Sequence, residues 1–380
     1  MITLKGITWD HARGYDPLIA ASALYLEEKG VAVNWQKRSL TNFGDQSLEA
    51  LSKQFDLIIM DHPHAGVAEA SRCLLSLHNL LAASTLQELK NASAGPSFES
   101  YHYHGTQWAL PIDAAMQCAS YRPDLLGSLP IPSNWKEVFD LSNVLKRKNL
   151  CIGMALCPTD CLCSFLSITA QWGSPITENN PLLVSTEVGI KALEMIRSMR
   201  DQFHPNVLDW NPIALYDHMS TENDIVYSPL AFCYTNYARD AFRQNLLHFH
   251  TAPEIKNAVL GGAGIAVTAS CKEPQIAADF AAWICSNTIQ SSIYVNAQGQ
   301  PGNKFAWEDA AANKLTHNFF SNTLATLSNA YVRPRYQGWP KFQQWLGEKI
   351  HAFLVNDKPP ELLLKELQEE YSASYKKENN

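Results

Sequence analysis

The order of apolar and polar runs near the start of the chain predicts strands that alternate with helices. Strands are expected at 2–9, 31–39 and 55–63, and the apolar run Leu57 to Met60 in the third is of the kind found in buried parallel sheets. Apolar positions with a helical period predict helices at 17–29, ending at Gly30, and at 47–54. This βαβαβ order predicts a doubly wound α/β sheet.

The stretch 259–302 carries the most distinctive pattern of the chain. Its first part is an apolar run broken by glycines, which predicts a strand, and the apolar period after it predicts one helix of about 20 residues. A turn rich in glycine and proline follows this helix. The apolar face of the helix is expected to be buried through Ala277, Phe280, Ala281, Ile284 and Ile289.

Helical patterns dominate the rest of the chain. The run 132–147 begins with capping residues and predicts a helix, and an amphipathic helix is predicted at 187–202. The segment 223–238 is interpreted as a strand followed by a turn. The last eighty residues are expected to be mostly helical, with a terminal amphipathic helix at 361–371.

The composition excludes several classes of partner. A formal net charge of −7 argues against nucleic acids and anionic membranes, because both attract clusters of Lys and Arg. No run of 18 apolar residues is present, so membrane insertion is not expected. A chain of 380 residues exceeds one typical hydrophobic core, which makes two domains the default expectation.

Six segments, in order along the chain, resemble motifs of the family 1 extracellular solute-binding proteins, the sugar-binding components of ABC importers. The glycine-rich strand and the elements after it match this family at Gly261, Gly262, Gly264, Ile265, Ala266, Ala277, Phe280, Trp283, Ile284, Ser286, Gln290, Gly299 and Pro301. Earlier matches are Gly105, Trp108, Ala109, Leu110, Pro111, Tyr121, Asp124 to Leu126, Trp135 and Glu137. The segments 223–238 and 331–339 also resemble family motifs, whereas Arg122 stands where the family usually has Asn.

The resemblance implies an α/β fold of two lobes, periplasmic-binding-protein-like of type II, with doubly wound mixed sheets joined by a multi-strand hinge. The first lobe is expected to comprise 1–112 and 256–302, and the second 115–250 and 305–380. The hinge crossings are expected near 112–115, 250–255 and 301–304. Such a fold closes around a ligand that lies between the lobes.

A sugar site needs aromatic side chains to stack on the sugar faces and polar groups to bind the hydroxyls. The resemblance and the expected carboxyl ends of the strands together indicate which residues border this site. From the first lobe the candidates are Trp9, Asp10, His11, Arg13, Asp61, His62, His64, Asp113 and Gly262, and from the second Asp160, Trp172, Tyr227, Tyr234, Tyr336 and Trp339. The turn Asp-His-Pro-His at 61–64 departs from the aromatic-rich turn of the sugar binders.

Three His-x-His pairs are possible metal ligands, since alternate residues of a strand face the same side. They are His62/His64, His102/His104 and His248/His250. The pairs fall in separate turns and hairpins, so we expect hydrogen-bonding histidines and no metal site. Only the first pair, with Asp10 or Asp61, is expected to meet a second element.

Other motifs predict no chemistry. The cysteines at 157, 161 and 163 lack the C-x2-C spacing of zinc sites, and Pro158 among them indicates the start of a helix. The run 261–266 lacks the third glycine of a dinucleotide fingerprint. No nucleophile lies in a recognisable catalytic motif. We therefore expect no catalytic residue and no cofactor.

The compartment is predicted from two features. No export signal precedes the first strand, and nine cysteines, an odd number, suit a reducing environment. Both favour a cytoplasmic chain. The alternative is the mature form of an exported protein, periplasmic or extracellular.

The leading hypothesis is a monomeric receptor of an ABC-type importer that binds a small polar solute, most plausibly a carbohydrate, and works with a permease. It is expected to be a binding protein and not an enzyme. Two alternatives remain open at this point: a cytoplasmic enzyme or ligand sensor on the same scaffold, and a metal-binding receptor that uses the Asp and His residues of the first lobe.

Overall fold

A computed structural model describes residues 1–378 of the chain, which form two compact units. Unit 1 comprises Met1–Ala115, Gly261–Lys314 and Arg335–Gln337. Unit 2 comprises Met116–Leu260, Leu315–Pro334 and Gly338–Asn380. The predicted lobes differ from these units most clearly at 305–314, which the prediction placed in the second lobe and which lies in unit 1.

The sheet of unit 1 contains the strands predicted from the first sixty residues. Its order is β2 (Val31–Arg38), β1 (Ile2–Trp9), β3 (Leu57–Met60), β10 (Leu260–Val267) and β6 (Leu110–Tyr121), whose second half belongs to unit 2. β1 is parallel to both β2 and β3, and β10 is antiparallel to β3. The sheet is therefore mixed, as predicted.

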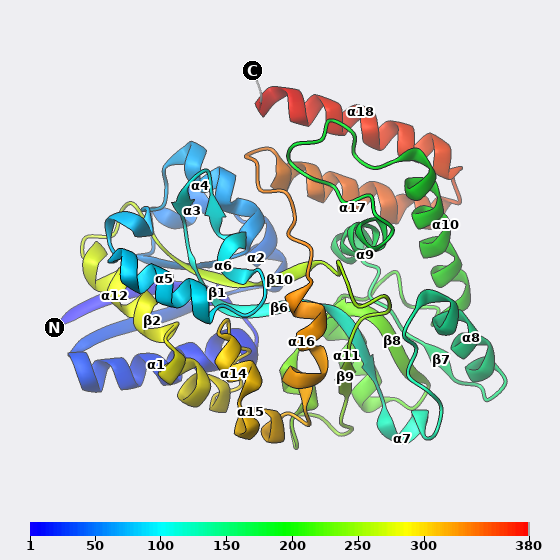
Figure 1. Cartoon of the computed structure of the whole chain (residues 1–380), viewed down its shortest axis with the longest axis horizontal. Coiled ribbons are helices and arrows are strands. Elements are labelled where there is room, and N and C mark those ends of the chain that lie inside the picture. Colours follow the sequence, from blue (N-terminus) through cyan, green and yellow to red (C-terminus); the bar gives the residue numbers. More distant parts are fainter. Residues whose placement is uncertain (379–380) are drawn as a thin grey trace. The chain divides into compact units, whose positions relative to one another are not determined.

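Apolar residues of β3 alternate between two core layers, one on each face of this sheet. Leu57 and Ile59 belong to one layer, with the buried faces of helices α1 (Ala12–Lys29) and α12 (Pro274–Ile284). Ile58 and Met60 belong to the other, with α3 (Leu48–Ser52) and α4 (Ala65–Ser71). Helices thus cover both faces of the sheet, which confirms the doubly wound arrangement (Figure 1).

The remaining elements of unit 1 are short. They are α2 (Leu40–Asp45), η1 (His62–His64), η2 (Leu77–Asn79), α5 (Ala83–Ala92), α6 (Ser97–Ser100), the hairpin of β4 (His102–Tyr103) and β5 (Thr106–Gln107), α13 (Asn287–Ile289), η4 (Gln290–Tyr294), α14 (Lys304–Glu308) and α15 (Ala310–Leu315).

Two predicted helices have different bounds in the structure. α1 begins at Ala12, five residues before the predicted start at Pro17, because His11 caps it by accepting a hydrogen bond from the Arg13 amide. It ends as predicted at Gly30, whose φ of 70° is left-handed. The single helix predicted after β10 is broken, because Ser286 is extended and starts a new turn. The distorted segment η4 (Gln290–Tyr294), a π-helical turn, follows.

The strands of unit 2 are β6, β8 (Ile225–Phe232), β7 (Cys151–Ile152) and β9 (His248–His250). β8 is antiparallel to β6 and parallel to β7, and β9 also pairs with β6. The helices are α7 (Pro123–Leu126), α8 (Trp135–Lys146), α9 (Pro158–Gln171), α10 (Thr186–Gln202), α11 (Pro212–Thr221), η3 (Thr235–Ala238), α16 (Phe319–Ser328), α17 (Trp339–Asn356) and α18 (Pro360–Glu378).

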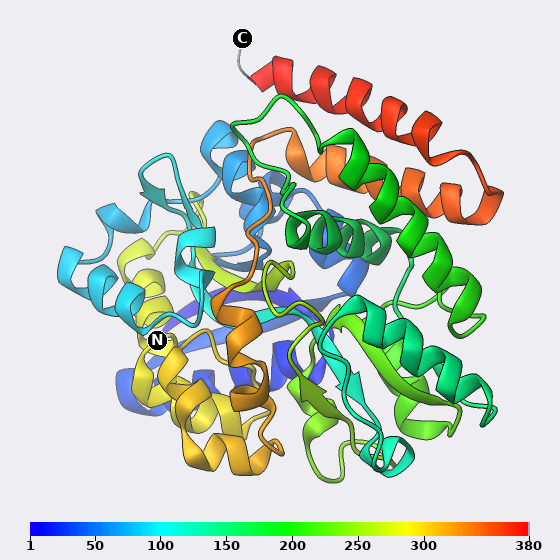
Figure 2. The same ribbon diagram turned by 45° about the vertical axis from the view of Figure 1, so that its right-hand side comes forward.

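Helices α9, α10, α17 and α18 of unit 2 pack against one another and lie side by side in both views (Figure 1, Figure 2). α9 is buried along nearly its whole length, which explains its run of small and apolar residues. Gly347 of α17 lies directly against the Pro158 carbonyl at the start of α9, where a larger residue would separate the two helices. In the described part of the chain no helix is long and apolar enough to cross a membrane.

Candidate functional site

Two of the predicted segments lie at one edge of the unit 1 sheet. β1 and β3 are parallel neighbours, so Asp10 after β1 and Asp61 after β3 follow at the same edge. β10 pairs Gly264 with Met60, and this register continued places Gly262 beside the turn that contains His62. We call this edge of unit 1, formed by residues 9–13, 61–64 and 262, the strand-end rim.

Trp9 is the last residue of β1 and is only 5% exposed. Its indole packs against Phe43, with ring centroids 5.2 Å apart, and against Gly14, where even a Cβ would collide with the ring. Its Nε1 is buried and has no hydrogen-bond acceptor among the described residues. The ring is therefore part of the core, with one polar atom left for another partner.

Arg13 and Asp113 form a buried ion pair in unit 1. Arg13 Nε donates to Asp113 Oδ2 over 2.8 Å, and Arg13 Nη2 donates to the second carboxylate oxygen. Burial raises the pKa of Asp113, and the Arg13 guanidinium opposes this change. The structure brings the two predicted residues together as partners of each other.

Gly262 holds the backbone of this pair in place. Its φ is +99°, and a Cβ would lie against the Asp113 carbonyl oxygen. Glycine has no Cβ, and it therefore allows the two backbones to approach this closely.

Gly262→Ala is expected to lower the free energy of unfolding by about 2 kcal/mol, because both the conformation and the contact exclude a side chain. Urea denaturation of the variant measures the change. Gly105→Ala is the matched control, since Gly105 also has a positive φ of +77° but open space around it. Equal losses in both variants would show that the contact with Asp113 contributes nothing.

The other residues of the strand-end rim are more accessible. Asp10 is exposed and forms an ion pair of 2.9 Å with Lys37. His11 is half-buried and caps α1. Asp61 is half-buried and caps the turn η1 by accepting from the His62 amide over 2.9 Å. These three side chains are the polar groups that the rim presents to solvent.

His62 and His64 lie in a 3-10 turn, whereas the possibility of a metal pair assumed a strand. Residues i and i+2 of such a turn point in different directions, so the pair does not present two imidazoles to one ion. His62 is fully buried and edge-on to Tyr101. His64 is also buried.

The other two His-x-His pairs are also engaged elsewhere. His104 has a φ of 44° and lies 2.9 Å from a Glu69 carboxylate oxygen. His248 stacks on His317. Within residues 1–378, none of the three pairs belongs to a group of three side chains that could hold a metal.

Tyr336 lies in a short segment of unit 1, 335–337, although the prediction gave it to the second lobe. The Arg335 carbonyl accepts from the Gly66 amide, and the Arg335 guanidinium donates to the carbonyls of Glu99 and His102. These bonds hold the segment on unit 1. The Tyr336 side chain is buried.

The candidates of unit 2 are mostly buried. Tyr227 on β8, Tyr234 and Trp339 are all inside, because β8 is covered on both faces and α17 packs on α9. Trp172, at the carboxyl end of α9, is half-buried. It is the accessible aromatic of the predicted second-lobe set.

Asp160 lies in the first turn of α9 and is 3% exposed. The Cys157 thiol donates to Asp160 Oδ2 over 3.0 Å. Burial raises the pKa of Asp160 to about 7, and the hydrogen bond from the thiol opposes the shift. The predicted helix start at Pro158 is confirmed, and Cys157 occupies the cap position.

All nine cysteines are free thiols. Seven are buried, and Cys151 and Cys157 are half-buried. Burial raises the pKa of Cys161 well above its ordinary value, which makes its thiol unreactive. The seven buried cysteines therefore act as small side chains of the core.

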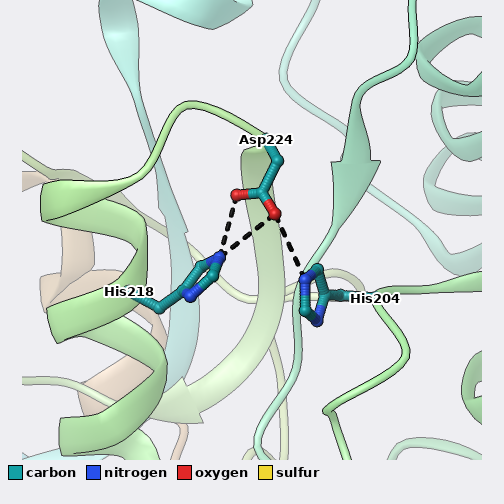
Figure 3. Close-up of side chains that lie close together, drawn as sticks. All are labelled: His204, His218 and Asp224. Atoms are coloured by element: carbon teal, nitrogen blue, oxygen red, sulfur yellow. Dashed lines mark hydrogen bonds and ion pairs between the residues drawn. The ribbon is translucent and has the colours of Figure 1, made fainter.

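One group of potential metal ligands was not predicted from the sequence. His204, His218 and Asp224 of unit 2 lie together (Figure 3). They come from the loop after α10, from α11 and from the residue before β8. Their spacing matches no motif, and only the fold brings them together.

The family of the chain follows from its sequence profile. The family described as bacterial extracellular solute-binding protein matches residues 21–319, which is most of the chain. The chain belongs to this family. The recognition made from six short motifs is therefore confirmed. No curated protein matches the chain.

Solved structures resemble this solute-binding protein over its whole length. A solute-binding protein of Agrobacterium radiobacter K84 in complex with ribitol has a TM-score of 0.83 at 18% identity, covering 98% of both chains. Maltose-bound T. maritima MalE3 has a TM-score of 0.82 at 15% identity, covering 98% of this chain and 100% of its own. A tagatose-bound protein of Thermotoga lettingae has a TM-score of 0.81 at 14% identity, covering 99% and 100%.

These likenesses show the fold alone, because all three identities are below 20%. The predicted class, a two-lobe α/β solute-binding fold, is confirmed. The family and these relatives are solute-binding proteins and not enzymes. The predicted cytoplasmic location finds no support, since the family is described as extracellular.

Proposed function

We propose that this solute-binding protein binds a small polyhydroxylated solute, a sugar or a sugar alcohol, as the receptor component of an ABC-type importer. The match to the family over residues 21–319 carries the proposal. The solute class is supported by relatives solved with ribitol, tagatose and D-mannitol.

The strand-end rim supplies the polar contacts of unit 1 in this proposal. Asp10, His11 and Asp61 are accessible there, and carboxylates form strong hydrogen bonds with sugar hydroxyls. Trp172 is the aromatic of unit 2 that is exposed enough to stack on a sugar face. Arg13 and Asp113 pair with each other beside this rim and so join α1 to β6 within unit 1.

We also propose that the protein is exported and acts as a monomer together with a membrane permease. The description of the family supports the exported location. Its nine free thiols are mostly buried, so they can persist outside the cytoplasm without pairing.

A thermal-shift screen against ribitol, mannitol, tagatose and maltose, followed by calorimetry, tests the proposal. A bound solute stabilises the folded state, by about 2.7 kcal/mol at a concentration one hundred times Kd, so the melting temperature is expected to rise. Asp61→Asn is expected to weaken binding, and Lys136→Gln, an exposed α8 residue paired with Asp140, is the control. The solute is expected to be recovered unchanged after incubation, as judged by its NMR spectrum.

Two outcomes contradict the proposal. Binding of amino acids or carboxylates with no response to any polyol would show a different solute class. Conversion of the recovered solute would show an enzyme.

A further inference from the structure

His204, His218 and Asp224 form a convergent group in unit 2. His204 Nε2 lies 3.2 Å from Asp224 Oδ2, and His218 Nε2 lies 2.9 Å from Asp224 Oδ1. The three ligand atoms all lie within 4.8 Å of one another, and the side chains point toward a common centre (Figure 3). Two imidazoles and one carboxylate are a ligand set that zinc and related ions take in proteins.

The spacing of these atoms suits a bound metal. Zinc binds nitrogen and oxygen ligands at about 2.0–2.2 Å, so tetrahedral ligand atoms lie roughly 3.3 Å apart. Asp224 Oδ2 lies 3.2 Å from His204 Nε2 and 3.1 Å from His218 Nε2, and both distances are close to that value. The ligand atoms of the two imidazoles lie within 4.8 Å of each other, so an approach of at most about 1.5 Å completes the geometry and leaves the fourth position to water.

The surroundings hold the three side chains in place. Trp210 stacks on His204, with ring centroids 4.5 Å apart, and packs against His218 at 4.8 Å. The His204 amide donates to the Ile152 carbonyl, and the Cys151 amide donates to the Asp224 carbonyl. His204 and Asp224 are therefore held by hydrogen bonds to β7, and both imidazoles are held by contact with Trp210, as a preorganised site requires.

Arg122 fixes the loop that carries Asp224. Its guanidinium is buried and donates to the carbonyls of Met219 and Glu222 and to the side chain of Asn223. These bonds cover the turn between α11 and β8. The partners of Arg122 are thus the residues that lead into Asp224.

We propose that His204, His218 and Asp224 bind a divalent transition metal of the zinc class, at a site separate from the strand-end rim and from the solute. The site is contained in unit 2. His204 is buried, whereas the His218 side chain is 23% exposed and the Asp224 side chain 41% exposed, so the group opens to solvent on the side of these two residues. A hydrated ion can therefore reach them without unfolding of the unit.

The metal competes with a hydrogen-bonded arrangement. His204 Nδ1 accepts from the Asn206 amide over 3.1 Å, so its Nε2 carries the hydrogen and faces Asp224. Metal binding needs the lone pair of Nε2, and the hydrogen of the neutral ring then moves to Nδ1 by exchange with solvent. The hydrogen bond from Asn206 is lost in that step, at a cost of about 1 kcal/mol. Zinc is thus expected to bind with moderate affinity and to change the environment of the Asn206 amide.

Titration of the full chain with zinc chloride, followed by calorimetry and native mass spectrometry, tests the proposal. One zinc ion is expected per chain, and His218→Gln and Asp224→Asn are each expected to weaken binding by about 10–100-fold. The double variant His102→Gln, His104→Gln is the matched control and is expected to bind zinc as the parent does. Melting temperatures of all variants show whether each one is folded.

A second measurement does not depend on any variant. In the parent protein, zinc is expected to shift the amide signal of Asn206 and the ring signals of both histidines in an NMR titration. Zinc binding that is unchanged in His218→Gln and Asp224→Asn, or zinc saturation without a shift at Asn206, overturns the proposal. So does the absence of zinc binding to the folded parent. None of these results affects the proposal of a polyol solute.

Discussion

Arg13→Ala is expected to lower the free energy of unfolding by about 3–5 kcal/mol at neutral pH. The guanidinium is the charged partner of the fully buried Asp113 carboxylate, and its removal leaves that charge uncompensated inside unit 1. Burial already raises the pKa of Asp113, with Arg13 acting against the shift. Urea denaturation of the parent and the variant at pH 8 measures the loss.

The pH dependence separates charge from packing. Without Arg13 the pKa of Asp113 rises further, so the carboxyl becomes neutral at a higher pH and costs less to bury. The loss in Arg13→Ala is therefore expected to shrink as the pH falls. The double variant Arg13→Gln, Asp113→Asn carries no buried charge and is expected to be more stable than Arg13→Ala. A loss that is the same at pH 5 and pH 8 would show that the missing packing, and not the charge, causes it.

Lys37→Ala is the control for a surface ion pair. Lys37 bonds to Asp10 in the same unit, but both side chains are substantially exposed. Water screens such a pair, and little change in stability is expected.

Local patterns were sufficient to predict the elements of the sheet in unit 1. β1 and β2 were predicted nearly to the residue, because period-2 alternation and a glycine stop are local signals. The start of α1 was missed since Pro17 suggests a first turn, whereas the actual cap, His11, is an uncommon capping residue. The break at Ser286 carries no proline or glycine, so nothing local marked it.

The exposure of the candidate site residues could not be predicted from the sequence, for one physical reason. Sequence order indicates which residues follow a strand, but burial depends on what packs over them. Trp9, Tyr227 and Trp339 were expected to face a ligand, and their rings are in the core. Asp10 and Asp61, which were chosen for the same reason as Trp9, remain accessible at the rim.

Histidines show the same limit. The His-x-His pairs were considered as metal ligands because alternate residues of a strand face the same side. His62 and His64, however, lie in a 3-10 turn, where this rule does not apply. His204, His218 and Asp224 share no motif. They converge because His204 and Asp224 each form a backbone hydrogen bond with β7, and because α11 packs on β8. A ligand set contributed by three elements cannot be read from spacing.

Asp160→Asn is expected to make the protein more stable at pH 8 and to have no effect near pH 4. The folded state holds the Asp160 proton with a pKa of about 7, against an ordinary value of 3.8. Between these values the folded state binds more protons than the unfolded state, so stability falls as the pH rises from about 4 to 7 and then levels off. An asparagine of the same shape avoids burying the ionised carboxylate and so removes this pH-dependent loss.

The size of the gain has an upper bound. A change in pKa from 3.8 to about 7 corresponds to a free energy on the order of 4 kcal/mol. The first turn of α9 favours a negative charge, and the Cys157 thiol donates to the carboxylate. Both are part of the environment that asparagine loses, so a gain of about 1–2 kcal/mol is expected in urea denaturation at pH 8.

Asp124→Asn supplies a control of opposite sign. The Arg122 guanidinium lowers the pKa of Asp124, so the ionised carboxylate stabilises the folded state at pH values above its ordinary range. Asp124→Asn is therefore expected to be less stable than the parent at pH 8, and the difference is expected to vanish in acid. If both variants changed stability in the same direction at pH 8, loss of the carboxylate charge would not be the cause in at least one of them. The carboxylate of Asp160 is buried without a cation, whereas the carboxylate of Asp124 is paired with a guanidinium. The two variants together test whether these two environments change the free energy of unfolding in opposite directions.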